Sequence, residues 1–415
     1  MLFRSAAFGG TTESLFQLGI PVAAAADGPS GIRMDSGHKA TQVPIGTLLA
    51  CTWNAPLNEA IFALVGRELR AYRIDTLLGP GINIHRHPLN GRNFEYFSED
   101  PFLTGAIAAA QTRGLAQAGV AGTIKHFAAN DQETARHDVD SVASERCLRE
   151  IHLKPFELAV KQGRASSLMT SYNPVNGHWA ASNYDLNTTI LRGEWGYTGI
   201  VMSDWWAKMN HPAEGGGGDR SFTSFMLRAQ NDLYMVVEND KAAQNPLNDN
   251  TLAALEKGEL TLGELQRAAM NICRFIMAAP VMERPLVPYD PVKRFAPRPD
   301  LPGDAVALAA GLEFNTKVNA AARMEVAEAG VYRVLARARN ERDRAAQSSC
   351  SLYLNGTFAM SIPVNGTEGR WVEVQGVPVR LEPGLYEVTL DFVKPGLELG
   401  RLEFARVEST AQGGL

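Results

Sequence analysis

Asp204 is the residue of this 415-residue sequence whose position points most directly to chemistry. It follows the apolar run 200–202 and is followed at once by Trp205 and Trp206. A β-branched run behind a glycine is typical of a buried parallel strand, and α/β barrels place catalytic groups at the carboxyl ends of such strands. A carboxylate beside tryptophan combines an acid with a flat apolar face, which suits a sugar ring. On this stretch alone, an Asp that caps the next helix is an equally good interpretation.

A second polar cluster lies in the loop 83–100, which follows the apolar run 74–78 and contains Arg92. A guanidinium can hold two adjacent sugar hydroxyl groups in a fork, which an ammonium group does less well. The alternative is a loop held together by Arg–Glu pairs.

A third cluster begins with Lys125 and His126, directly after the run 122–124, and continues to Arg136. A Lys–His pair at a strand end suits a phosphate site, an acid/base pair or a clamp for hydroxyl groups. The sequence has no glycine-rich phosphate loop beside it, which weakens the first option. Taken alone, His126 would more often be a satisfied core histidine. The histidine spacing gives no metal site and no Gly-x-Ser-x-Gly element is present, so we expect no metal and no cofactor.

The elements that must position these clusters alternate between short apolar runs and helical patterns over residues 1–280. Strands are expected at 22–26, 74–78, 122–124, 167–170, 200–202 and 232–237, and helices at 56–72, 104–118, 144–161, 186–194 and 252–279, with a flexible run at 215–218. Each polar cluster follows a strand, so all of them gather at one end of a parallel sheet. The pattern predicts an α/β fold of the TIM-type (β/α) barrel class, complete or incomplete.

The composition changes after residue 280. Residues 281–303 are rich in proline and are expected to form an extended linker. Residues 304–415 show period-two patterns with Asn-Gly and Pro-Gly turns, which predict an all-β sandwich domain. This domain is either a carbohydrate-binding module or a spacer. Its aromatic residues, such as Tyr332 and Trp371, belong more often to a core than to a ligand platform.

The net charge of −5 argues against partners such as nucleic acid or a membrane surface. The cysteines at 51, 147, 273 and 350 are scattered, which favours buried thiols in a reducing, cytoplasmic compartment. A dense motif arrives within the first residues of the chain, so we expect the natural protein to extend upstream of Met1.

Five motifs together resemble the barrel domain of glycoside hydrolase family 3. They are DGP (27–29), GRNFEYFSEDP (91–101), KHFAANDQETAR (125–136), MTSYNPVNG (169–177) and GYTGIVMSDWW (196–206). They occur in the order of the family and cover nearly all of residues 10–280. The resemblance is to the β-glucosidase branch, because the β-N-acetylhexosaminidase branch carries a KHFPGHG-type loop where this chain reads KHFAANDQE.

The resemblance implies a retaining, exo-acting β-glycosidase that releases terminal β-linked glucose through a covalent glycosyl–Asp204 intermediate. Asp204 would be the nucleophile and Trp205 would pack against the sugar. The other residues implied to bind the carbohydrate substrate are Asp27, Arg92, Lys125, His126, Arg136 and Tyr172. Because Lys125, Arg92 and Arg136 would surround it, Asp204 is expected to keep a low pKa.

The second carboxyl group of a retaining glycosidase has no counterpart in these motifs. In the β-glucosidase branch it comes from a separate α/β sandwich domain, which some members carry ahead of the barrel. We therefore expect the acid/base residue to belong to such a missing domain. The partners considered are this domain and a second copy of the chain. The alternatives to a β-glucosidase are a non-hydrolytic carbohydrate-binding protein and a β-xylosidase of the same family.

Overall fold

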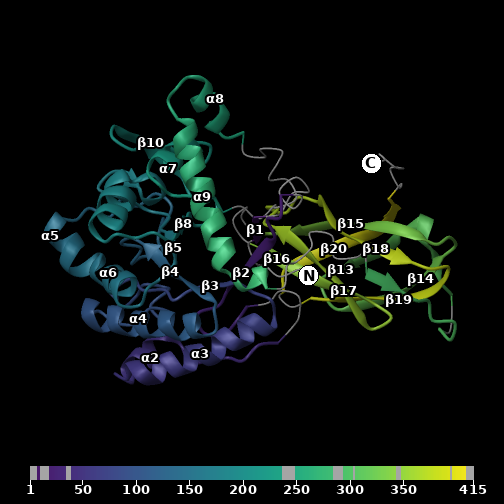
Figure 1. The fold of residues 1–415 in the computed structure, drawn as a ribbon. Coiled ribbons are helices and arrows are strands. Elements are labelled where there is room, and N and C mark those ends of the chain that lie inside the picture. The colour runs from purple at the N-terminus through teal and green to yellow at the C-terminus, as the bar shows by residue number, and fades with distance from the viewer. Residues whose placement is uncertain are drawn as a thin grey trace. The chain divides into compact units, whose positions relative to one another are not determined.

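The computed structural model describes residues 7–9, 18–33, 39–235, 248–283, 293–301, 304–342, 347–392 and 395–407. The chain divides into two compact units, an N-terminal unit that includes residues 40–288 and a C-terminal unit that includes residues 289–415 (Figure 1). Within the described residues, no helix is long and apolar enough to cross a membrane.

A six-stranded sheet organises the N-terminal unit, in the order β1-β2-β3-β4-β5-β8. Its strands are β1 (Ala7–Gly9), β2 (Val22–Asp27), β3 (Thr76–Leu78), β4 (Ala121–Phe127), β5 (Ser167–Thr170) and β8 (Ile200–Met202). The strands from β2 to β8 are parallel and β1 is antiparallel to β2. The sheet curls into part of a barrel. Because the strands from β2 to β8 are parallel, their carboxyl ends lie at one edge of the sheet.

The helices that cover this sheet begin where the sequence supplies caps. They include α2 (Gly46–Cys51), α3 (Ala55–Ala71), α4 (Pro101–Gln117), α6 (Lys154–Lys161), α7 (Thr223–Arg228), α8 (Thr251–Glu256) and α9 (Leu262–Ala278). Asn54 caps α3 and Asp100 caps α4, and each helix has proline in its first turn, where a missing N–H costs nothing. A capping box between Thr261 and Glu264 starts α9.

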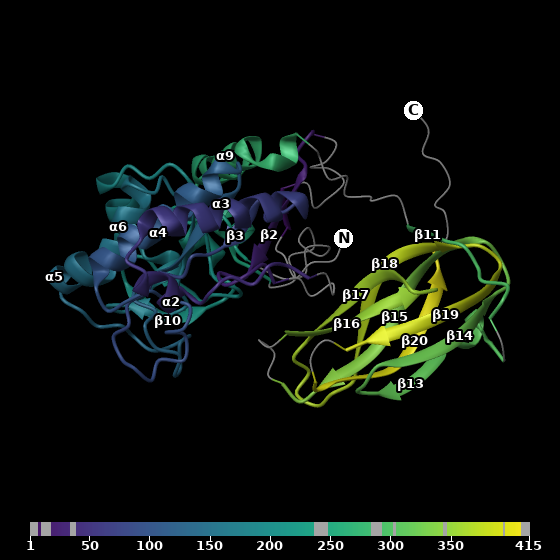
Figure 2. The same cartoon turned by 90° about the horizontal axis from the view of Figure 1, so that it is seen from below.

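Helices α3 and α4 pack side by side (Figure 2), and glycine permits their close approach. A Cβ atom on Gly114 would stand 2.3 Å from the carbonyl oxygen of Glu59, and one on Gly66 would stand 2.9 Å from the Cβ of Ala118. On the other side, Phe275 of α9 shares a buried cluster with residues of β2 and β8. The sheet is therefore covered by helices on two sides.

Several predicted elements differ in the structure. The helix predicted over 252–279 is two helices, α8 and α9, because the chain turns at Gly258 with a φ of +73°. The run 215–218, predicted to be flexible, belongs to strand β10 (Gly215–Asp219), which pairs with β9 (Met209–His211).

The helices predicted over 144–161 and 186–194 contain π-helical turns. The first comprises α5 (Glu145–Cys147), η1 (Leu148–His152) and α6, and the second is η3 (Asp185–Glu194). Of the strand predicted over 232–237, the described part forms one isolated bridge, between Leu233 and Met202, and residues 236–237 lie outside the described residues. The prediction of buried thiols holds for Cys350 and is wrong for Cys51, which is exposed.

The C-terminal unit contains two five-stranded sheets, in the orders β11-β18-β15-β20-β13 and β12-β14-β19-β16-β17. The strands are β11 (Lys293–Phe295), β12 (Val306–Ala307), β13 (Leu312–Thr316), β14 (Ala320–Val326), β15 (Gly330–Asn340), β16 (Gln347–Leu354), β17 (Thr357–Asn365), β18 (Val372–Leu381), β19 (Gly384–Asp391) and β20 (Leu397–Arg406). Alternate residues of both sheets, such as Val334 and Leu352, share one hydrophobic cluster. Asn355 and Gly356 both have positive φ, which confirms the predicted Asn-Gly turn. Strand β11 lies within the range predicted as a linker.

Asp75 joins the start of the parallel sheet to the segment after α9. Its Oδ2 accepts a hydrogen bond from the Ala24 N–H at 2.7 Å, and its Oδ1 accepts one from the Val281 N–H at 2.8 Å. Burial raises the pKa of Asp75 to about 6, although these two hydrogen bonds oppose the shift. The folded state therefore favours the protonated carboxyl, and the unfolding free energy should fall as the pH rises from about 4 through about 6.

We predict that Asp75→Asn removes this pH dependence. The two-unit difference in pKa corresponds to about 3 kcal/mol, which the wild-type chain should lose between pH 4 and pH 7 and the variant should keep. Urea unfolding of both proteins, followed by circular dichroism at several pH values, measures the difference. Asp185→Asn, at an exposed carboxyl, is the matched control. A difference between Asp75→Asn and wild type that is equal at pH 4 and pH 7 would contradict the prediction.

Candidate active site

Asp204 lies two residues beyond the fully buried strand β8 and is itself 4% exposed. Its Oδ1 accepts a hydrogen bond from the N–H of Trp205 at 2.8 Å, and its Oδ2 is 3.8 Å from Nε2 of His126. The residues that follow form a turn, and the next α-helix begins at Thr223. The helix-cap interpretation therefore fails, and the carboxylate points into a polar cluster.

The predicted site residues meet at this edge because each lies at or beyond the carboxyl end of a parallel strand. Asp27 ends β2, and Lys125 and His126 are among the last three residues of β4. Tyr172 follows β5, and burial and the neighbouring charge of Asp204 raise the pKa of its hydroxyl group. Arg92 and Arg136 come from the loops after β3 and β4 and also act on the charge of Asp204. The strand-end prediction is thus confirmed for the geometry of the cluster.

The sequence predicted a low pKa for Asp204, and this prediction is wrong. Burial raises the pKa of this carboxyl, and the opposing effects of Arg92, the Trp205 N–H, Arg136 and Lys125 do not bring it back to the ordinary value. An ionised Asp204 is therefore held by surrounding cations and hydrogen bonds against a strong desolvation cost.

Asp27 shows the opposite balance. Its Oδ1 accepts a hydrogen bond from Nζ of Lys125 at 2.7 Å, and Arg33 approaches its Oδ2 at 3.7 Å. Burial alone would raise the pKa of Asp27, but Lys125, Arg33 and Arg92 lower it to about 2. Asp27 is therefore ionised at neutral pH, and the Lys125 ammonium is fixed against it.

His126 is buried among cations. Burial lowers its pKa well below the ordinary value, and Arg92, Lys125 and Arg136 lower it further. The Asn83 carboxamide accepts from the His126 backbone N–H at 2.9 Å, and the Tyr96 hydroxyl is 3.3 Å from its Nδ1. A neutral imidazole in this position serves as a hydrogen-bonding group and not as a cation.

Aromatic rings line the cluster next to the arginines. The guanidinium of Arg136 lies 4.7 Å from the centroid of the Tyr172 ring, and the His137 ring contacts Tyr172 in a tilted arrangement with the centroids 4.1 Å apart. Trp205 is half-buried, and its ring centroid is 6.2 Å from that of Trp206. An acidic group, several hydroxyl-binding cations and apolar ring faces together form a surface that suits a sugar.

The N-terminal domain profile of glycosyl hydrolase family 3 matches residues 9–275. The chain belongs to glycosyl hydrolase family 3. The resemblance drawn from the five sequence motifs is therefore confirmed.

Known members of the family are similar over most of the chain. A beta-glucosidase of Ruminococcus albus is 44% identical over 417 residues, which are 97% of this chain and 43% of the relative. The crystal structure of a beta-glucosidase from Paenibacillus barengoltzii has a TM-score of 0.69 and 58% identity, covering 96% of this chain and 43% of that one. Beta-glucosidase 3B from Thermotoga neapolitana, in complex with glucose, has a TM-score of 0.58 and 40% identity over 64% of this chain and 37% of that one. The chain thus spans less than half the length of these relatives.

Reasoning from single motifs missed several residues of this family 3 site. Arg92 pairs with Glu95, as the loop-tying alternative proposed, and it still acts on Asp204. Asn83 and Tyr96 hold His126, and Glu133 pairs with Arg136 at 3.0 Å. All of these lie inside the polar stretches 83–100 and 125–136, so their presence was visible but their contacts were not.

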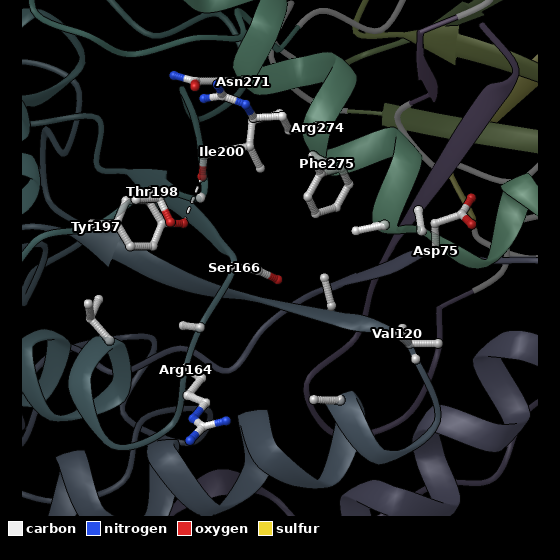
Figure 3. A pocket seen from close by; sticks show the side chains of 18 of the residues that line it. Asp75, Val120, Arg164, Ser166, Tyr197, Thr198, Ile200, Asn271, Arg274 and Phe275 are labelled. Atoms are coloured by element: carbon white, nitrogen blue, oxygen red, sulfur yellow. Dashed lines mark hydrogen bonds between the residues drawn. The ribbon is translucent and has the colours of Figure 1, made fainter. Parts of the chain in front are cut away.

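A cavity of about 500 Å³ lies at the opposite end of the strands, before β5 and β8 begin (Figure 3). Ser166, Thr198 and Phe275 line it, with Arg164 and Arg274 at its margin. None of the predicted site residues lines this cavity, although residues 196–200 of the last family motif do. Among the residues that the structure describes, no group of three or more His, Cys, Asp and Glu side chains could hold a metal ion.

We predict that Lys125→Met raises the pKa of Asp27 from about 2 to its ordinary value of 3.8 or above. The substitution removes the hydrogen-bonded cation while the burial that raises the pKa remains. A carbon-13 titration of labelled aspartate carboxyl groups, assigned with Asp27→Asn, measures this pKa. Lys161→Met, which breaks an exposed pair with Glu157, is the control and should leave Asp27 unchanged. An Asp27 pKa that stays near 2 in Lys125→Met would refute the assigned role of Lys125.

Proposed function

We propose that this chain carries the nucleophile and the terminal-sugar subsite of a retaining, exo-acting β-glucosidase. The observation that carries the proposal is Asp204, a buried carboxylate at a strand end surrounded by Lys125, Arg92, Arg136 and the neutral His126. Membership of family 3 and the similarity to beta-glucosidases support it. In this proposal the substrate is a terminal β-linked glucose on an oligosaccharide or glycoside.

In the proposed reaction, an oxygen of Asp204 attacks the anomeric carbon while the bond to the leaving oxygen breaks. The leaving oxygen takes a proton from a general acid, and water then hydrolyses the glycosyl–Asp204 ester to release glucose and regenerate the carboxylate. The sugar hydroxyl groups are bound by six side chains, and Trp205 packs against the sugar ring. The six are Asp27, Arg92, Lys125, His126, Arg136 and Tyr172. Hydroxyl-binding groups that tighten as the ring flattens would lower the barrier.

The general acid is proposed to lie outside this chain, in an α/β sandwich domain. A retaining enzyme needs a second carboxyl roughly 5–5.5 Å from the nucleophile. Glu95 and Glu133, the carboxyl groups near Asp204, are paired with Arg92 and Arg136. The chain's coverage of 43% of the Ruminococcus albus relative leaves room for such a domain. A homo-oligomer and a cytoplasmic location stay predictions from the sequence.

For the C-terminal unit we propose a β-sandwich that acts as a spacer. Of its aromatic residues, Tyr332 and Tyr386 are buried in the shared core. Trp371 is half-buried, lies over Gly400 and has the guanidinium groups of Arg337 and Arg339 within 5.2 and 4.6 Å of its ring. The aromatic residues are thus already engaged within the unit, which favours a core role over a carbohydrate-binding platform.

A non-hydrolytic carbohydrate-binding protein is the second candidate, since both nearby glutamates are held in ion pairs. We predict that 2-deoxy-2-fluoroglucosyl fluoride forms a stable adduct at Asp204, because its fluoride leaving group needs no proton and its 2-fluoro substituent slows hydrolysis of the ester. Intact-mass and peptide mass spectrometry would locate the adduct.

Asp204→Ala should form no adduct, and Asp185→Ala should behave as wild type. Cellobiose, whose leaving group needs a proton, should be turned over poorly by this chain alone. Reversible binding of the fluoride without an adduct would instead support the binding protein, and turnover of cellobiose that Asp204→Ala abolishes would place the acid within this chain.

A further inference from the structure

Asn83 fixes which nitrogen of the His126 ring carries the hydrogen. Its carboxamide forms a reciprocal pair with the His126 backbone, in which Oδ1 accepts from the N–H and Nδ2 donates to the C=O, both at 2.9 Å. This pair determines which end of the carboxamide is the oxygen. The same Oδ1 is 3.3 Å from Nδ1 of the His126 ring. Because a carboxamide oxygen can only accept, the ring nitrogen that faces it must carry the hydrogen.

Tyr96 requires the same arrangement of the ring. Its hydroxyl oxygen lies 3.3 Å from Nδ1 of His126 and 3.2 Å from the backbone oxygen of Asn130. A backbone oxygen can only accept, so the single hydroxyl hydrogen of Tyr96 is directed to Asn130 and the hydroxyl oxygen is left to accept from Nδ1. Burial raises the pKa of Tyr96, so the hydroxyl keeps its hydrogen. Two neighbours of different chemistry thus agree on a ring with hydrogen on Nδ1.

The other ring nitrogen of His126, Nε2, is therefore an acceptor. Its burial among cations keeps the ring neutral, so only one of the two nitrogens carries a hydrogen. Nε2 makes no hydrogen bond with the residues that the structure describes, and it is not shut off from solvent as Nδ1 of His137 is. It lies 3.8 Å from Oδ2 of Asp204, which is too far for a hydrogen bond. A donor that reaches Nε2 therefore comes from water or a ligand and lies beside the Asp204 carboxyl group.

We infer that Asn83 and Tyr96 are positioning residues, which hold His126 as its Nδ1–H tautomer so that Nε2 accepts a hydrogen bond from one hydroxyl group of the terminal sugar. This inference rests on the function proposed above. The lysine and arginine side chains of the site can only donate to a sugar oxygen, whereas Nε2 can only accept a hydroxyl hydrogen. The opposite tautomer would place a donor beside Asp204 instead. The tautomer thus decides how one sugar hydroxyl group is oriented.

The tautomer can be measured directly, without a ligand. In a chain with nitrogen-15 in its histidine rings, two-bond proton–nitrogen correlation spectra at pH 7 distinguish the two tautomers and the imidazolium, and His126→Gln identifies the signals of His126. We expect the Nδ1–H tautomer. Tyr96→Phe removes one of the two acceptors and should shift the ring nitrogen frequencies toward those of a mixture. Tyr197→Phe, which removes a buried hydroxyl bonded to the Ile200 oxygen at 2.9 Å (Figure 3), is the matched control and should leave them unchanged.

Glucose then tests whether Nε2 is the acceptor. On titration with glucose, the Nε2 signal of the wild-type chain should move toward the frequency of a protonated ring nitrogen, because a hydroxyl group donates to it. One of 2-, 3-, 4- and 6-deoxyglucose, which lacks that hydroxyl, should bind without this movement. We expect Tyr96→Phe to weaken glucose binding about 2- to 10-fold, the effect of an ordinary hydrogen bond. That one deoxy sugar should bind Tyr96→Phe and wild type equally, and Tyr197→Phe should bind glucose as wild type does.

A His126 ring with hydrogen on Nε2, or on both nitrogens, would overturn the assigned tautomer. Binding of glucose without movement of the Nε2 signal, or equal movement with all four deoxy sugars, would overturn the role of Nε2 as acceptor. These results come from the wild-type chain, so they do not depend on the folding of Tyr96→Phe. Failure of the wild-type chain to bind glucose would instead refute the proposed function, and the tautomer measurement would stand without it.

Discussion

The ion pair between the buried Lys125 and Asp27, whose side chain is 34% exposed, is the interaction on which the rest of the site depends. The Lys125 side chain is 4% exposed, and it meets Asp27 across the neighbouring strand β3. A cation in this position needs a fixed counter-charge, since a buried charge without a partner is costly. Once it is fixed, Lys125 lowers the pKa of His126 and opposes the desolvation of Asp204. Lys125 thus contributes, after burial and Arg92, to the charge states of the groups around it.

The raised pKa of Asp204 is compatible with a nucleophile. Its anion is stabilised by cations and one backbone N–H, and burial works against it. A sugar that develops positive charge at its anomeric carbon would stabilise this anion more than the empty site does. Interactions that are stronger in the transition state than in the ground state are the ones that accelerate a reaction. We infer that the desolvation of Asp204 serves the attack, provided that the arginines keep it ionised.

The sequence was sufficient to predict which residues meet, because that depends on a local rule. Asp27, Lys125, Tyr172 and Asp204 each lie within a few residues of a strand end, and parallel strands bring their carboxyl ends together. The direction of the Asp204 pKa shift depends on burial, which is decided by packing across the whole unit. The bonds of Asp75 to Ala24 and Val281, which lie 51 and 206 residues away, were beyond sequence reasoning for the same reason. Strand β11 was missed because it has only three residues and lies in the proline-rich range.

The same electrostatics argue that the general acid comes from elsewhere. A group that donates a proton at neutral pH must be protonated there, and pairing with a guanidinium favours the ionised form. Glu95 is bonded to Arg92, and Glu133 is bonded to Arg136. Burial raises the pKa of Glu133, while its Oε2 holds the Arg136 guanidinium that lies over the Tyr172 ring. The cations around Asp204 thus also pair with the carboxyl groups beside it, which supports the proposal that the acid comes from a second domain.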